Sequence, residues 1–237
     1  MSTETDRKPL SADIAIPSER SLAGWEIASV FSSVLIAEWI LSAAAGQTKF
    51  IVLIPVLIPV TLALVLVIGS QFLHKEGLRE LGIRFDNFLG AIKLLALPMI
   101  VVALICVAVG LMSGAGPDLF RWHAERALAW QLIVGFGWGF VQQYVLQSVI
   151  NRRAQIVWRR GFVSVFVTAL IFALLHFPNP WLMLLTFIGG LVWAFTYQRM
   201  PNLFALALSH SLMTWVLVST LPASVLNHLR YGFKYFA

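Results

Sequence analysis

The stretch GFVQQYVLQSVINRR, residues 139–153, decides how this chain is interpreted, because three uncharged amides interrupt an otherwise apolar run. The amides belong to Gln142, Gln143 and Gln147. Gln143 and Gln147 are four residues apart, hence on one face of a helix, and Gln142 lies about 100° round from Gln143. The stretch therefore predicts a largely apolar helix that carries a polar sector near one end, just before a pair of arginines.

The composition places this helix in a membrane protein. Of the 237 residues, 59% are hydrophobic and 12% are charged, and the mean hydropathy is +0.83, far from the balance of a soluble domain. The net charge of +6 comes from basic residues that fall between apolar runs, so it indicates membrane topology and argues against a nucleic-acid partner. Cys106 is the single cysteine, which excludes an internal disulfide and a cysteine metal cluster.

Seven apolar runs approach or exceed the length of about 20 residues that a membrane-spanning helix needs. They cover residues 22–45, 50–73, 87–112, 127–150, 161–177, 181–198 and 202–220. We therefore expect an all-α, polytopic transmembrane helical bundle of about seven spans, or eight if residues 224–236 add a short interfacial segment. Residues 1–21 are expected to form a polar N-terminal tail, residues 22–220 the bundle, and residues 221–237 a short C-terminal tail or interfacial helix.

The distribution of lysine and arginine predicts the orientation of the bundle. With the N-terminus inside, the inner segments hold eleven of these residues and the outer segments five, which favours a cytoplasmic N-terminus. Much of the margin comes from residues 151–160, interpreted as a basic loop that anchors the inner side, with attraction of anionic headgroups or an acidic partner as the alternative. The compact spans favour a bacterial inner (cytoplasmic) membrane.

Polar residues inside the spans are the functional candidates, because burying a polar or charged group in a membrane costs free energy. His176 ends the fifth run and His210 lies in the seventh; imidazole is an acid or base near neutral pH and a common zinc ligand. Thr214 follows His210 by one helical turn and could orient its ring or touch a substrate. The two histidines are candidate ligands for a divalent metal such as zinc, with Glu38 as a third. The alternative for Glu38 is a carboxyl paired with Lys93 or kept protonated.

The simplest interpretation of the three glutamines is helix packing. Amides that bond across to neighbouring helices contribute about 0.6 kcal/mol each on average. Gly135 and Gly139, spaced by four residues, and the pair Gly189 and Gly190 are typical of helices that approach closely. The glutamines alone therefore leave a structural and a functional role open.

Three motifs stand in a particular order along the chain. FALLH at 172–176 is a Phe-x-x-x-His motif, and HSLMT at 210–214 matches His-x-x-x-Asn with Thr in place of Asn. QQYVLQ at 142–147 falls where a Glu-Glu-x-x-x-Arg motif is expected, with Gln at all three polar positions. This order resembles the CAAX prenyl protease and bacteriocin-processing (CPBP) intramembrane endopeptidases. The resemblance covers residues 74–220, the expected family core, and is strongest from residue 135.

The resemblance implies roles for these positions. In the family the first Glu of the pair is taken as the base that activates water, and the histidines hold that water or stabilise the oxyanion. Gln142 then takes the position of the base, and Gln143 and Gln147 take those of the supporting Glu and Arg. His176 and His210 take the remaining catalytic places. A neutral amide accepts no proton near neutral pH, so Gln142 cannot act as a base.

We therefore expect a degenerate member of the family, proteolytically weak or inactive, that binds a membrane peptide or partner in an assembly, chaperone or immunity role. The alternative is an active CAAX-type endopeptidase that uses His176 and His210 with a non-standard base such as Glu38. A second alternative is a small transporter or lipid-binding protein, less favoured because the sequence shows neither repeat halves nor many intramembrane charges. The expected partners are membrane lipid and a membrane-embedded or lipid-modified peptide or protein, with no nucleic acid.

Overall fold

The computed structural model describes residues 18–44, 53–114, 118 and 128–236, and within these ranges all regular structure is helical, which confirms the predicted fold class. The longer helices are α1 (Glu19–Ala44), α2 (Leu53–Leu73), α3 (Phe88–Met112), α4 (Leu128–Gln143), α6 (Phe162–Leu174), α7 (Pro180–Arg199) and α8 (Leu203–Thr220). The shorter ones are the π-helix η2 (Tyr144–Asn151), α5 (Arg152–Trp158), α9 (Ala223–Leu226), and the 3-10 helices η3 (Asn227–Leu229) and η4 (Gly232–Phe236).

Several of these helices are suited to a lipid bilayer. Within the described ranges, four are long and apolar enough to cross a membrane, namely Glu19–Ile40, Phe88–Met112, Pro180–Arg199 and Leu203–Thr220. Shorter apolar helices cover Leu57–Leu73 and Phe162–Leu174. The predicted apolar runs coincide in position with α1, α2, α3, α4, α6, α7 and α8, while the number that cross the membrane stays a prediction.

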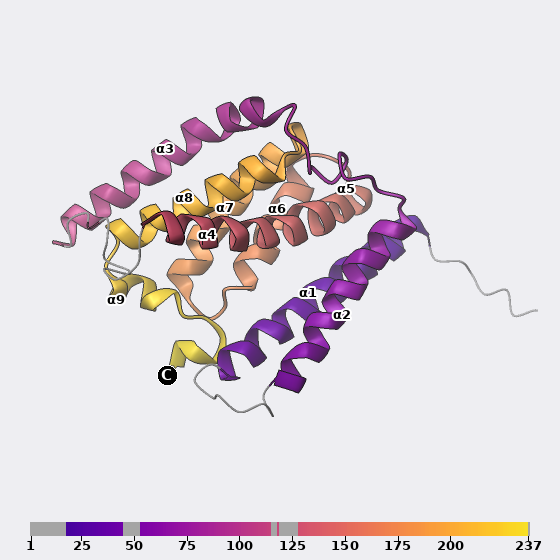
Figure 1. Cartoon of the computed structure of the whole chain (residues 1–237), viewed down its shortest axis with the longest axis horizontal. Helices are drawn as coiled ribbons and strands as arrows, with labels where there is room; N and C mark the ends of the chain where they lie inside the picture. Colours follow the sequence, from indigo (N-terminus) through magenta and orange to yellow (C-terminus); the bar gives the residue numbers. More distant parts are fainter. Residues whose placement is uncertain (1–17, 45–52, 115–117, 119–127, 237) are drawn as a thin grey trace, which may run out of the picture.

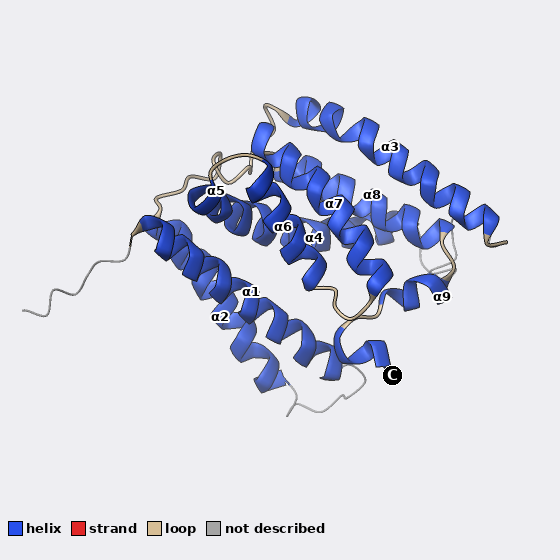
Figure 2. Cartoon of the chain, turned by 180° about the vertical axis from the view of Figure 1, so that it is seen from behind, coloured by secondary structure: helices blue, strands red, loops and turns tan. Residues whose placement is uncertain are grey.

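The helices form a central group flanked by two outer elements. Figures 1 and 2 show α1 and α2 side by side on one flank, α3 on the opposite flank, and α4, α6, α7 and α8 between them. A Cβ atom at Gly139 would lie 3.2 Å from the carbonyl oxygen of Ala207, and one at Gly190 would lie 2.9 Å from Cα of Ala169. These glycines therefore allow α4 to approach α8 and α7 to approach α6, as their positions in the sequence predict.

The structure corrects the interpretation of residues 151–160 as a basic loop. α4 continues through η2 into α5, so the helix runs on to Trp158. Arg153 is wholly buried, and its neighbour Arg152 bonds the carboxylate of Glu76 at 2.7 Å. A count of charges treats every arginine as solvated, whereas two here are held by a carboxylate distant in sequence. Arg153 is consequently not available to lipid headgroups, and the charge of Arg152 is paired with Glu76.

Arg153 joins three parts of the chain. Its guanidinium donates to the two carboxylate oxygens of Glu76 at 2.7 and 2.9 Å, to Ser70 Oγ at 2.8 Å, and lies 2.8 Å from Glu26 Oε2. Burial raises the pKa of Glu76, but hydrogen bonds and charges from Arg153 and Arg152 outweigh it and hold that pKa below its usual 4.5. The cluster thereby fastens α1 and the end of α2 to the start of α5.

Arg153→Met should destabilise the protein by about 3–5 kcal/mol, because it removes the buried cation shared by Glu76 and Glu26 and leaves Glu76 with Arg152 alone. Thermal unfolding in detergent micelles measures the effect. Arg79→Met is the matched control, since Arg79 is 72% exposed in its pair with Asp86 and such surface pairs contribute about 0–1 kcal/mol. Equal melting temperatures for the two variants would contradict the role assigned to Arg153.

Acid should remove the same stabilisation. The folded-state pKa of Glu76 lies below the unfolded value near 4.5, so its contribution is present above that pH and is lost as the pH falls through the lower folded-state pKa. Stability measured between pH 7 and pH 3 should therefore fall less steeply in Glu76→Gln than in the native chain. Parallel pH profiles would show that Glu76 carries no such linkage.

Candidate functional site

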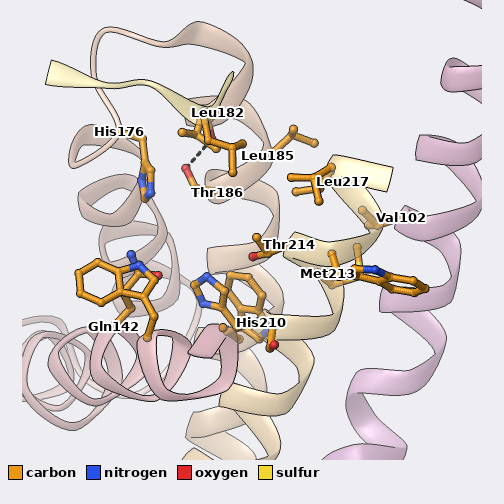
Figure 3. Close-up of a pocket in the computed structure, with 18 of the residues that line it drawn as sticks. Val102, Gln142, His176, Leu182, Leu185, Thr186, His210, Met213, Thr214 and Leu217 are labelled. Atoms are coloured by element: carbon orange, nitrogen blue, oxygen red, sulfur yellow. Dashed lines mark hydrogen bonds between the residues drawn. The ribbon is translucent and has the colours of Figure 1, made fainter. Parts of the chain in front are cut away.

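A cavity of about 400 Å³ lies between α3, α4, α7 and α8, and the C-terminal segment closes part of it. Most of its lining is aliphatic or aromatic, including Val102, Leu185 and Leu217. Figure 3 shows that four polar residues also face it, Gln142, His176, His210 and Thr214. Gln142 lies on α4, His176 just after α6, and the other two on α8. The cavity is thus apolar along most of its wall and polar where the three sequence motifs meet.

The His210 ring is fixed from two sides. Gln143 Nε2 lies 3.1 Å from His210 Nδ1, a contact that the close approach of α4 and α8 at Gly139 permits. The Trp193 ring stacks on the imidazole at 4.7 Å between centroids and 5° between planes, and its Nε1 donates to Ser209 Oγ at 3.1 Å. The orientation of His210 is therefore set by α4 and α7.

Behind this contact runs a chain of buried amides. Gln147 Nε2 donates to Gln143 Oε1 at 3.1 Å, and Asn151 Nδ2 donates to Gln147 Oε1 at 2.8 Å. Gln198 Nε2 donates to Asn151 Oδ1 at 3.0 Å. Gln143, Gln147 and Asn151 each have 0% exposure. We call these four residues, Gln143, Gln147, Asn151 and Gln198, the amide chain; it links the cavity to the far end of α7 without any charge.

Two main-chain groups set the direction of the amide chain. The Gly161 N–H donates to Gln198 Oε1 at 3.1 Å, and Asn151 Nδ2 donates to the carbonyl of Ala194 at 3.2 Å. A main-chain N–H only donates and a carbonyl only accepts, so each amide must present its nitrogen toward the cavity side. Gln143 therefore donates to His210 Nδ1, and the neutral His210 ring carries its proton on Nε2.

His176 takes the opposite tautomer. Its Nδ1 lies 2.8 Å from the carbonyl oxygen of Phe172; because that oxygen only accepts, Nδ1 donates and the neutral ring has its lone pair on Nε2. The Phe172 ring makes edge contacts with both imidazoles, at centroid distances of 5.0 Å to His176 and 5.9 Å to His210. Phe172 thus contacts both histidines, one in the turn after α6 and the other in α8.

The C-terminal segment packs on the His176 end of the cavity. The Tyr231 ring lies 5.6 Å from the His176 ring and lines the cavity. Asn179 is 1% exposed, and its Nδ2 donates to the carbonyls of Leu226 and Arg230, both at 2.9 Å. The segment expected to be a tail or interfacial helix therefore contributes a wall of the site, anchored by the asparagine of the hairpin after His176.

Glu38 does not belong to the cavity lining, and it lies on α1 while Lys93 lies on α3 at the opposite flank (Figures 1 and 2). The Glu38–Lys93 pair considered from the sequence is therefore wrong. Over the described ranges, no three His, Cys, Asp or Glu side chains come together to hold a metal. Catalytic zinc sites use three protein ligands, so His176 and His210 by themselves do not fit one.

The candidate residues separate into two groups. Gln142, His176, His210 and Thr214 line the cavity, whereas Gln143 and Gln147 lie behind it in the amide chain. The ring of His210 is bonded by Gln143, so Thr214 is left as a wall residue of the cavity.

Sequence reasoning missed Asn151, Gln198 and Trp193. The four-residue spacing of Gln143 and Gln147 continues to Asn151, which was a usable signal. Nothing in the local sequence marks Gln198 or Trp193, because their partners are distant along the chain. All three missed residues orient the site, and Trp193 also lines the cavity.

A family model described as type II CAAX prenyl endopeptidase Rce1-like matches residues 94–216, just over half of the chain. The chain belongs to the Rce1-like family. The matched range includes all three sequence motifs, and with its apolar helices it makes this Rce1-like chain an integral membrane protein. No curated protein and no solved structure matches the chain.

The chemistry available in this Rce1-like site is limited by its charge. Among the described residues that line the cavity there is no Asp, Glu, Lys or Arg. The polar side-chain groups are the amide of Gln142, hydroxyls, indoles and the two imidazoles. Such a set can hold a ligand by hydrogen bonds, but the only strong lone pair that it offers as a base is Nε2 of His176.

Gln147→Leu should destabilise the protein by about 1–3 kcal/mol for each partner left unpaired, because Gln143 Oε1 loses its only donor among the described residues. Thermal unfolding in detergent measures the loss. Gln155→Leu is the matched control, since Gln155 is only partly buried and Asn151 Oδ1 keeps its bond from Gln198. If the control melts as early as Gln147→Leu, the amide chain has no special structural role.

Proposed function

We propose that this Rce1-like protein is a non-proteolytic member that binds a lipid-modified or membrane-embedded peptide in the cavity of α3, α4, α7 and α8. The observation that supports it is that neutral amides, those of Gln142, Gln143 and Gln147, stand where the family resemblance expects an acid pair and an arginine, and that Gln143 and Gln147 are bonded into the uncharged amide chain. Gln142 faces the cavity and cannot take a proton from water. Loss of a general base costs about 10²–10⁴-fold in rate.

His176 does not replace the missing base. Its Nδ1 donates to the neutral carbonyl of Phe172, not to a carboxylate. In the Ser-His-Asp type of hydrolytic site, a carboxylate orients the histidine base and stabilises the imidazolium that forms. Here an imidazolium at His176 would have neutral neighbours in a cavity with no acidic lining residue. Proton abstraction from water by this ring is therefore unfavourable.

The shape of the cavity suits a ligand with an apolar chain and a polar end. Its volume of about 400 Å³ lies within the range of about 300–1,000 Å³ typical of ligand pockets. A lipid chain would lie along Val102, Leu185 and Leu217, and the adjoining peptide would reach Gln142 and the histidines. Membrane lipid could enter the same apolar part, so competition by lipid is expected.

We place the N-terminus in the cytoplasm of a bacterial inner membrane, with a role in assembly, as a chaperone or in immunity. The excess of lysine and arginine in the predicted inner segments supports this orientation. With Arg152 and Arg153 held by Glu76, the exposed Arg159 and Arg160 carry the positive charge at this end of α5.

An active endopeptidase is the second candidate, and one observation favours it. His176 and His210 lie at one cavity, held in fixed orientations by Phe172, Trp193 and Gln143. Such a pair could hold a water molecule between an acceptor and a donor.

Cleavage in cells separates the two candidates. Mass spectrometry compares the N- and C-terminal peptides of membrane proteins in three kinds of cell: with the native chain, with His176→Ala and with no copy of the protein. A non-proteolytic protein should give the same peptides in all three. Gln142→Glu/Gln143→Glu/Gln147→Arg, which restores acids and a compensating cation, should yield a new product that disappears when His176→Ala is added. A product made by the native chain and lost in His176→Ala would establish the endopeptidase.

Binding is tested with a photoreactive S-farnesylated peptide in nanodiscs. The native chain should be labelled on α4 or α8, and Val102→Trp, which fills the apolar part of the cavity, should reduce labelling at least about tenfold. The Leu97→Trp control places the same side chain on the outer face of α3, where Leu97 is 72% exposed. Equal labelling of the native chain and Val102→Trp would refute binding in this cavity.

A further inference from the structure

We infer that the histidine pair selects its ligand by charge: the cavity accepts an uncharged group that both donates and accepts hydrogen bonds, such as a peptide amide or carboxamide, and rejects a carboxylate. This inference rests on the proposed function, in which the cavity binds a lipid-modified peptide. It specifies which chemical form of that peptide is held.

The two imidazoles offer one donor and one acceptor. In each ring Nδ1 is used by the protein, by the Phe172 carbonyl at His176 and by the Gln143 amide at His210. No described residue bonds either Nε2, and both rings line the cavity. His210 therefore presents an N–H and His176 presents a lone pair. A ligand amide matches both, with its carbonyl toward His210 and its N–H toward His176.

A carboxylate meets this pair unfavourably. It has acceptors only, so it can bond the N–H of His210 but faces the lone pair of His176. The described lining residues include no Lys or Arg to neutralise it, and a buried charge without a partner carries a large free-energy cost. Gln142 can donate one bond from its amide, which does not balance a full charge.

The amide chain stops the His210 ring from adapting. If His210 moved its proton to Nδ1, Gln143 would have to turn its oxygen toward the ring, and Gln147 and Asn151 would have to reverse in turn. That reversal would break the bonds that fix the chain direction at Ala194 and, through Gln198, at Gly161. Stacking on Trp193 restrains the ring itself. The donor and acceptor pattern is therefore built into the helices and is independent of the ligand.

This selection distinguishes an intact lipid-modified peptide from the acid that its hydrolysis leaves. A peptide bond presents an N–H and a carbonyl together, whereas hydrolysis of that bond leaves a carboxylate and an amine. A site with this polarity retains the uncut lipopeptide and releases the acid.

The test compares N-acetyl-S-farnesylcysteine carboxamide with the corresponding free acid at pH 7.5. For each probe, we measure the concentration that displaces the photoreactive peptide from the native chain in nanodiscs. Empty nanodiscs provide the correction for the different partition of the two probes into lipid. We expect the carboxamide to bind at least about tenfold more tightly, the effect of one unsatisfied or repulsive contact. Equal corrected affinities overturn the inference while leaving peptide binding intact. If neither probe displaces the peptide and the peptide itself does not label the cavity, the proposed function fails as well.

His176→Gln assigns the selection to the ring. The side-chain amide of the variant can turn an NH₂ toward the cavity, so the free acid should bind more tightly. The ratio of carboxamide affinity to acid affinity should therefore fall below about threefold. A ratio unchanged from the native chain overturns the assignment to His176. Where His176→Gln folds poorly, Gln143→Leu serves instead, because it frees His210 to change tautomer and should reduce the ratio in the same direction.

Discussion

The hydrogen bond from the Gln143 amide to Nδ1 of His210 is the contact on which the site depends. It ends a chain of neutral donors and acceptors that begins at the main chain of Gly161, so the orientation of one imidazole is decided at the far end of α7. It also requires α4 to lie close to α8, which Gly139 permits. In an apolar interior such a chain avoids the cost of burying charges while satisfying each amide.

The same fold does bury charge, but away from the cavity. Arg153 is wholly enclosed and is matched by Glu76 and Glu26, where it fastens α1 and the end of α2 to the central helices. One continuous helix from α4 to α5 thus carries a neutral chain beside the cavity and, two residues beyond Asn151, the arginine of an ionic cluster. The absence of acids from the described cavity lining is accordingly a local property of the site.

Much of the fold follows from the sequence, because apolar length is sufficient to locate helices in a membrane protein. The positions of the helices and the glycine contacts were predictable from local pattern alone. The helical course of residues 151–158 was not, because the partner of Arg153 comes from a segment about 77 residues earlier. The same reason hid Gln198, Trp193 and the C-terminal wall of the cavity. Motifs identified the side chains that face the cavity, but long-range packing determines which nitrogen of each histidine faces it.

The tautomers of the two histidines test this account most directly. Nitrogen-15 NMR of histidine-labelled protein in nanodiscs, with His176→Asn and His210→Asn to assign the signals, distinguishes protonated from unprotonated ring nitrogens. The account predicts opposite tautomers, with the proton on Nδ1 in His176 and on Nε2 in His210. A proton on Nδ1 of His210 at neutral pH would contradict it, because the amide chain could then no longer run in the direction that its main-chain anchors impose. An imidazolium at His176 would also contradict it, because the ring would then have no lone pair on Nε2.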